Sequence, residues 1–126
     1  MNIIHESEAS GDQFEYPHKR IVRHIVAPWT MGSKNLWIGT STVEPENKTN
    51  SHAHDVNEEV FYCVSGEGKI IVDGEEKEYT PGTVVFCPPG SYHQIINTGK
   101  EPLKSVCSVS PPFEQEQFNN DHDPNK

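Results

Sequence analysis

The residues best suited to chemistry are three histidines and a glutamate from separate parts of the chain. His52 and His54 are separated by one residue, Glu59 follows shortly after them, and His93 lies much further along the sequence. In a β-strand, side chains at i and i+2 point to the same face, so His52 and His54 should look the same way. Three imidazoles and one carboxylate suit a divalent first-row metal such as Fe, Mn, Ni, Co or Zn. The sequence therefore predicts a metal site formed by His52, His54, Glu59 and His93.

A β-hairpin is the simplest element that would assemble these residues. Residues 55–58 have an ordinary length for a hairpin loop, and the apolar run 60–64 has the composition of a returning strand. Such a hairpin would place Glu59 beside the two neighbouring histidines. His93, on a third strand, would complete the group.

The rest of the chain favours an all-β fold. β-branched and apolar runs are separated by Gly, Pro and Asp-Gly turn signals, and no helical period of useful length is visible. This pattern is typical of a β-sandwich or barrel. The expected strands cover residues 20–27, 36–43, 52–54, 59–64, 69–72, 75–79, 83–87, 92–97 and 103–109.

The chain of 126 residues has the length of one domain with a modest core. Residues 20–112 are expected to form the β-barrel. Residues 1–19 are polar without a clear period, and would be either a frayed leader or an arm that packs on a partner. The acidic tail, residues 113–126, is expected to be disordered. Phe113 and Phe118 could still dock, for example on a neighbouring subunit.

The net charge and the cysteine content indicate which binding partners and which cellular compartment suit this chain. The formal net charge is −9, and no Lys/Arg cluster is present, which argues against binding to nucleic acid or to an anionic membrane surface. No apolar run approaches the roughly 20 residues that span a bilayer, and no signal peptide is visible. Three widely spaced cysteines without a CxxC pattern argue against a disulfide framework. A reducing cytoplasm is the simplest location.

The stretch from Pro45 to Asn97 resembles the cupin superfamily of small jelly-roll barrels. The first family motif runs Gly, five residues, His-x-His, three or four residues, Glu, six residues, Gly; the second runs Gly, five residues, Pro-x-Gly, two residues, His, three residues, Asn. The positions of this chain that match the two motifs are His52, His54, Glu59, Gly66, Gly82, Pro88, Gly90, His93 and Asn97. One position departs: Glu46 stands where the first motif begins with glycine. We expect Asn47 to take any left-handed conformation that this turn requires, because Asn tolerates it.

The resemblance implies a double-stranded β-helix, or jelly-roll barrel, with a metal held inside by His52, His54, Glu59 and His93. The motif has six residues between its Glu and its Gly, which is the spacing between Glu59 and Gly66. The resemblance therefore implies Glu59, rather than its neighbour Glu58, as the ligand. Small cupins often pair their barrels, so a homodimer is expected.

Strand alternation predicts which other side chains face the interior. If Glu59 points inward, Phe61 and Cys63 do too, and Tyr62 and Val64 face outward. His93, Ile95 and Asn97 would share one face, with Asn97 fixing the strand end by hydrogen bonding. Cys63 is expected to be a small buried hydrophobe, and Trp29 and Trp37 packing or interface residues. Four histidines have no partner at ligand spacing and are expected at the surface: His5, His18, His24 and His122.

Four protein ligands on a six-coordinate metal would leave two positions open for a chelating small molecule, or for substrate and O₂. Three hypotheses follow. The first is a metal-dependent enzyme (a dioxygenase, decarboxylase, isomerase or lyase) that acts on a small anionic or chelating metabolite. The second is a binding or sensing module that holds a metal-chelated ligand without turnover. In the third, the metal only links strands of a structural barrel.

Overall fold

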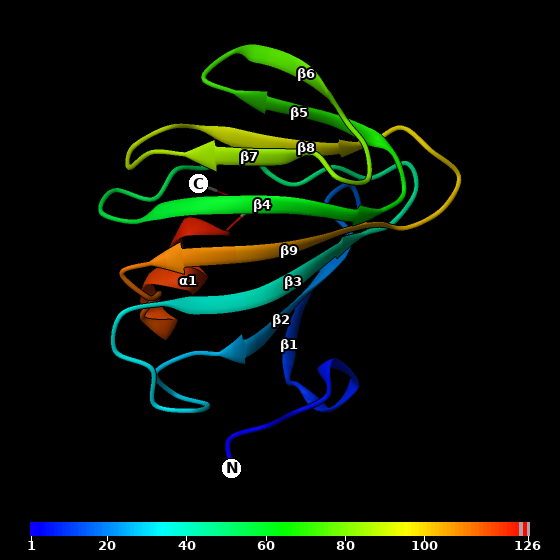
Figure 1. Cartoon of the computed structure of the whole chain (residues 1–126). Helices are drawn as coiled ribbons and strands as arrows, with labels where there is room; N and C mark the ends of the chain where they lie inside the picture. Colours follow the sequence, from blue (N-terminus) through cyan, green and yellow to red (C-terminus); the bar gives the residue numbers. More distant parts are fainter. Residues whose placement is uncertain (124, 126) are drawn as a thin grey trace.

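The computed structural model describes residues 1–123 and 125. Two antiparallel sheets form the molecule, one with six strands in the order β1-β2-β3-β9-β4-β7 and one with three strands in the order β6-β5-β8 (Figure 1). The strands are β1 (Gly11–Phe14), β2 (Arg20–Val26), β3 (Trp37–Val43), β4 (Glu58–Ser65), β5 (Gly68–Val72), β6 (Glu75–Tyr79), β7 (Val84–Cys87), β8 (His93–Asn97) and β9 (Leu103–Ser110). The all-β jelly-roll expected from the sequence is confirmed.

The core lies between the two sheets. Strands of the large sheet contribute Val22, Trp37 and Phe61, and the small sheet contributes Ile70 and Ile95, all buried. The alternation predicted for β4 is confirmed, because Phe61 and Cys63 are buried while Tyr62 and Val64 are exposed. The three cysteines are free and buried, as expected for small apolar residues.

Asn97 closes the end of β8 as predicted. Its side-chain amide donates to the carbonyl oxygens of Val43 and Glu101, each at 2.9 Å, and its Oδ1 accepts from the backbone N–H of Gly99 at 2.9 Å. All polar groups of a buried side chain are thereby satisfied. This residue ties the end of the small sheet to the large one.

The N-terminal arm packs on the chain's own large sheet. Its strand β1 pairs with β2, from Gly11 opposite Arg23 to Phe14 opposite Arg20. Before it, a 3₁₀ turn (Glu6–Glu8) places the Glu6 carboxylate against the Thr40 hydroxyl, at 2.6 Å, and against Lys104. Residues 6–14 are thus not frayed, because they pack on the chain's own sheet and β1 forms its edge.

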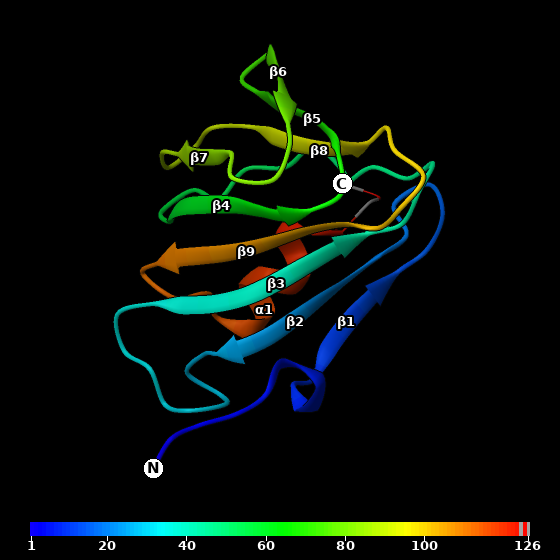
Figure 2. The same cartoon turned by 45° about the vertical axis from the view of Figure 1, so that its right-hand side comes forward.

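The disorder predicted for the C-terminal tail is wrong for the part of it that the structure describes. Residues Gln115–Asp121 form helix α1, which lies behind β3 and β9 in both views of the molecule (Figures 1 and 2). Phe113 and Phe118 are each 1% exposed and belong to the core cluster. Two aromatic anchors therefore supply the apolar burial that the polar composition of the tail seemed to lack. Residues 124 and 126 lie outside the described part of this segment.

The first motif's turn also differs from the prediction. Glu46 itself adopts the left-handed conformation, with φ of 67°, and Asn47 does not. The Asn47 side chain is engaged elsewhere: its Oδ1 accepts from the backbone N–H of Lys19 at 2.8 Å, and its amide donates to the Pro45 carbonyl at 2.9 Å. The turn therefore keeps the shape that glycine would give it, at the expense of backbone strain at Glu46.

No helix in the described part of the chain is long and apolar enough to cross a membrane.

Candidate metal centre

The segment that carries His52 and His54 is not part of a local hairpin. Residues 47–52 run antiparallel to β8 instead, with bridges between Lys48 and Ile96 and between His52 and His93. The backbone N–H groups of His52 and His93 donate to each other's carbonyl oxygens at 3.2 and 2.9 Å. The predicted pairing with residues 60–64 is wrong, because β4 pairs with β7 and β9 in the opposite sheet. The histidines and Glu59 therefore approach one another from two facing layers.

A turn of the second motif fixes His54. The backbone N–H of Gly90 donates to the carbonyl oxygen of His54 at 2.8 Å, and Gly90 has a φ of 80°. A residue with a β-carbon is disfavoured at this φ, which explains why glycine suits the position. The turn also leads directly into β8, so the same element sets both His54 and His93.

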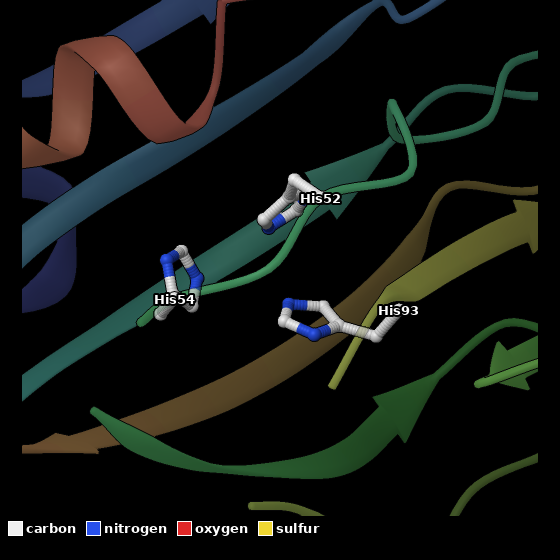
Figure 3. A group of neighbouring side chains, drawn as sticks. All are labelled: His52, His54 and His93. Atoms are coloured by element: carbon white, nitrogen blue, oxygen red, sulfur yellow. The ribbon is translucent and has the colours of Figure 1, made fainter. Parts of the chain in front are cut away.

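Three imidazoles gather inside the barrel. His52, His54 and His93 are 8%, 2% and 2% exposed, and each offers a ring nitrogen within 4.8 Å of the others. Figure 3 shows the rings of His52 and His54, from one irregular segment, and the ring of His93, from the start of β8, around a common space. A group of this kind can hold a metal ion.

The second nitrogen of each ring is held by an oxygen acceptor. Nδ1 lies 2.7 Å from the Asn50 carbonyl in His52, 2.8 Å from the Asp121 carboxylate in His54 and 3.3 Å from the Ser91 carbonyl in His93. A carbonyl or carboxylate oxygen only accepts, so Nδ1 carries a proton in each ring and Nε2 is the nitrogen that could bind a metal. Metal-binding histidines are commonly oriented in this way.

Glu59 lies beside two of these nitrogens. Its Oε1 is 3.2 Å from Nε2 of His54 and 3.4 Å from Nε2 of His93. All three atoms are buried and have no hydrogen-bond partner among the described residues. Ligand atoms about 2.1 Å from one metal and at right angles to each other are about 3 Å apart. The spacing of these orphaned atoms therefore fits a shared cation.

The protonation of the group without metal follows from its burial. Burial opposes charge on Glu59, but the close approach of the His54 and His93 imidazoles outweighs it and lowers the pKa of Glu59 to about 2. Burial likewise opposes charge on His93, and the side chains of Cys87 and Glu59 raise its pKa to about 10. Burial and the nearby imidazoles His93 and His54 keep the pKa of His52 well below its usual value. An ionised carboxylate thus faces the histidines.

Helix α1 supplies two site residues that the sequence analysis missed. Asp121 is the acceptor for His54, and the buried His122 lies with its ring 4.4 Å from that of His52. His122 and His24 were both expected at the surface, and both are buried. The Nε2 of His24 lies 2.7 Å from the Asp12 carboxylate, and its Nδ1 accepts from the Trp37 indole N–H at 3.2 Å. One signal in the sequence was aromatic: Phe113, Phe118 and His122 recur at spacings that a buried turn and helix can place together.

The cavity at the site is small. About 30 Å³ of space is bounded by the site residues His52, Glu59 and His93 on the barrel side, and by Phe113, Phe118 and His122 on the C-terminal side. A water needs roughly 10–15 Å³ by this measure, so the cavity has room for about two waters. A larger ligand would need the C-terminal segment to shift, because the strands around the site are tied by backbone hydrogen bonds.

The profile of the cupin domain family matches residues 39–109, which contain all four residues described above. The chain belongs to the cupin family. Its fold is also that of a solved predicted oxalate decarboxylase from Thermotoga maritima, with a TM-score of 0.76 at 21% identity over 86% of this chain and 97% of that one. The barrel expected from the two motifs is thereby confirmed.

Cupins of similar sequence include enzymes. The chain is 31% identical over 96 residues to the uncharacterized protein MJ1618 of Methanocaldococcus jannaschii, covering 76% of this chain and 77% of that protein. It is 36% identical to an L-ectoine synthase of Bordetella petrii over 58% of this chain, and 33% identical to a 5-nitrosalicylic acid 1,2-dioxygenase of a Bradyrhizobium species over 51%. The match covers only 55% and 30% of those two enzymes.

Proposed function

We propose that this cupin is a metal-dependent enzyme that acts on a small anionic or chelating metabolite, with a divalent ion held by His52, His54, Glu59 and His93. One observation carries the proposal: the buried Nε2 atoms of His54 and His93 and the Oε1 of Glu59 converge without hydrogen-bond partners. Leaving such atoms unpaired in a protein interior costs about 1–3 kcal/mol each. A cation would use all of them.

The bound ion would act as a Lewis acid and as a template for a chelating ligand. The chain's own residues set the conditions around it. Asn50, Asp121 and Ser91 hold the three imidazoles in the tautomer that a metal requires. Phe61 from the barrel and Phe118 from the C-terminal segment exclude water from the cavity. Such dry surroundings strengthen electrostatic interactions with an anionic ligand. Dioxygenase, decarboxylase, isomerase and lyase chemistry all fit this arrangement.

A non-catalytic binding or sensing module is the second candidate, and the small size of the cavity favours it. Turnover requires repeated exchange of substrate and product, and the C-terminal segment lines the site with the buried rings of Phe113, just before α1, and Phe118, within it. A module that holds one chelated ligand has no such need.

Metal content and turnover can be tested separately. Protein purified without chelator or nickel affinity resin is analysed for Fe, Mn, Ni, Co and Zn, and we expect about one ion per chain. His54→Ala and His93→Ala should each lower that content sharply, while the exposed His5→Ala, the matched control, should not. Equal metal content in all variants would contradict the site. Oxygen uptake by the Fe(II)-loaded protein with catechols, thiols and keto acids then tests for a dioxygenase, and tight ligand binding without any product would favour the binding module.

A homodimer and a reducing cytoplasm are part of the proposal. The outer face of the large sheet supports the dimer, because it carries an exposed apolar patch: Tyr62, Val64, Val84, Phe86 and Val106. Patches of this kind commonly mark interfaces. Sedimentation should show a dimer that Phe86→Glu dissociates and that Lys77→Glu, on exposed β6, leaves intact. The three free, buried cysteines support the compartment.

A further inference from the structure

Arg20 lies in the wall of the metal cavity. It is a buried cation that forms no ion pair in the described part of the chain. Its side chain is 3% exposed, and it stands on β2 two residues before the core residue Val22. Its guanidinium donates to two neutral oxygens, the His18 carbonyl at 3.3 Å and the Asn50 Oδ1 at 3.0 Å. Its Cζ also lies 4.0 Å from the centre of the Phe14 ring. None of the ion pairs in the described part of the chain involves Arg20.

The lack of a carboxylate partner is unusual for a cation that is buried. Acidic residues outnumber basic ones by 19 to 10, so potential partners are plentiful. Buried charges in proteins are normally paired, because an uncompensated one costs several kcal/mol. Burial lowers the pKa of Arg20 only to about 10, so the group stays charged at neutral pH. A positive charge is thus maintained in the cavity wall, and no carboxylate of the described residues forms an ion pair with it.

Asn50 connects this cation to the metal centre. The side chain of Asn50 accepts from Arg20, and its backbone carbonyl accepts from Nδ1 of His52 at 2.7 Å. Arg20 lines the same cavity as His52, Glu59 and His93, and no lysine or second arginine among the described residues lines it. With a divalent ion, three neutral imidazoles and one carboxylate, the metal centre carries a charge of about +1. Arg20 adds a second positive charge on one side of the cavity.

We propose that Arg20 forms an anion-binding subsite that holds one carboxylate of a small organic acid while the opposite, chelating end of the same molecule binds the metal. This inference rests on the proposed function and names its substrate class: acids with two separated anionic or chelating ends. The planar guanidinium suits a carboxylate because it can donate two parallel hydrogen bonds to it. The alternative is that Arg20 only links His18, Asn50 and Phe14 and so supports the fold.

The test compares two ligands that differ at one end. L-malate carries a 2-hydroxy acid that chelates metals and a remote carboxylate; its 4-amide keeps the chelating end and replaces the remote carboxylate by a neutral group. Calorimetry with the Mn²⁺-loaded protein should show malate binding about 10- to 100-fold more tightly than the amide, the range expected for a charge-assisted contact. Equal affinities, or no binding of either ligand, would overturn the inference.

Variants assign the preference to Arg20. Arg20→Gln should abolish the difference between malate and its amide, and Arg23→Gln, which removes an arginine from the opposite face of the same strand, should keep it. An Arg20→Gln protein that melts earlier but still prefers malate would show that Arg20 serves only the fold. If this variant does not fold, Arg20→Lys takes its place, because it keeps the charge and loses the planar guanidinium. Arg20→Lys should prefer malate over the amide by a smaller factor than the wild type. An unchanged preference for malate would count against the subsite. Wild-type protein that holds no Mn²⁺ would instead refute the metal site itself.

Discussion

The hydrogen bond between Asp121 and His54 gives a sharp test of how the C-terminal helix serves the metal centre. Oδ2 of Asp121 accepts from Nδ1 of His54 at 2.8 Å, and the carboxylate also accepts from Gln117 at 3.2 Å. Asp121→Asn keeps the size of the side chain and an oxygen that can still accept the proton. It removes the negative charge and turns the second carboxylate oxygen into an NH₂ donor. The variant therefore tests mainly the electrostatic contribution of Asp121 to the imidazole.

The expected loss follows from the strengths of the two hydrogen bonds. A bond to a charged group contributes about 1.5–3 kcal/mol and a neutral one about 0.5–1.5 kcal/mol, so the substitution should cost roughly 1–1.5 kcal/mol. The Asp121 side chain is 23% exposed, which favours the lower half of the range. A carboxylate that polarises a ligating imidazole changes metal affinity about 10- to 100-fold when it is lost. We therefore expect metal to bind Asp121→Asn about 10-fold more weakly.

Competition with a chromophoric chelator measures the dissociation constant for Co²⁺ or Zn²⁺ directly. Asp123→Asn is the matched control, because Asp123 lies two residues away and its side chain bonds the backbone of Asn125 and no histidine. The reasoning fails if Asp121→Asn binds metal as tightly as the wild type. It fails equally if Asp123→Asn loses as much affinity, since the effect would then be one of overall charge.

Two further substitutions probe the turn and the closure of the site. Glu46→Gly should raise the free energy of unfolding by roughly 0.5–1 kcal/mol, because glycine relieves the left-handed strain at φ of 67° while adding some unfolded-state entropy. Urea denaturation measures the free energy of unfolding. The control is Glu44→Gly, at a residue without positive φ, which should be destabilising. A Glu46→Gly protein less stable than the wild type would contradict the claim that Glu46 is strained. Phe118→Ala should speed amide exchange in residues 113–123, because the ring is 1% exposed and packs 4.1 Å from His122 and 4.6 Å from His24. Exchange as slow as in the wild type would show that Phe118 does not hold α1.

The structure brings the four predicted ligands together although one part of the reasoning was wrong, because the prediction depended on residue types and spacing rather than on the pairing of strands. His52 and His54 point into the barrel although they do not lie in a regular strand, and the bridge to His93 replaces the hairpin that the sequence suggested. The loop 55–58 has a hairpin's length, but its flanking segments pair with strands far away in sequence. Local turn rules carry no information on such long-range partners.

The C-terminal helix was not predictable from composition. Residues 113–126 are mostly polar and acidic, which normally prevents burial of enough apolar surface. Helix α1 is short, and its stability comes from Phe118 and from Phe113 just before it. A capping box between Glu114 and Gln117 starts the helix, and that pattern was visible in the sequence. The place where the two aromatic rings dock was not, because it exists only once the barrel has formed.

Closure of the cavity and binding of a metal both depend on helix α1, so we expect each to affect the other. Helix α1 carries both Phe118, which covers the cavity, and Asp121, which orients His54. If a metal binds more tightly when Asp121 is in place, then by thermodynamic reciprocity the metal also stabilises the docked helix by the same free energy. A ligand that has to shift α1 to enter would loosen the support of His54 as it does so. Redocking of the helix over a bound ligand would then restore the orientation of the imidazole and exclude water in the same step.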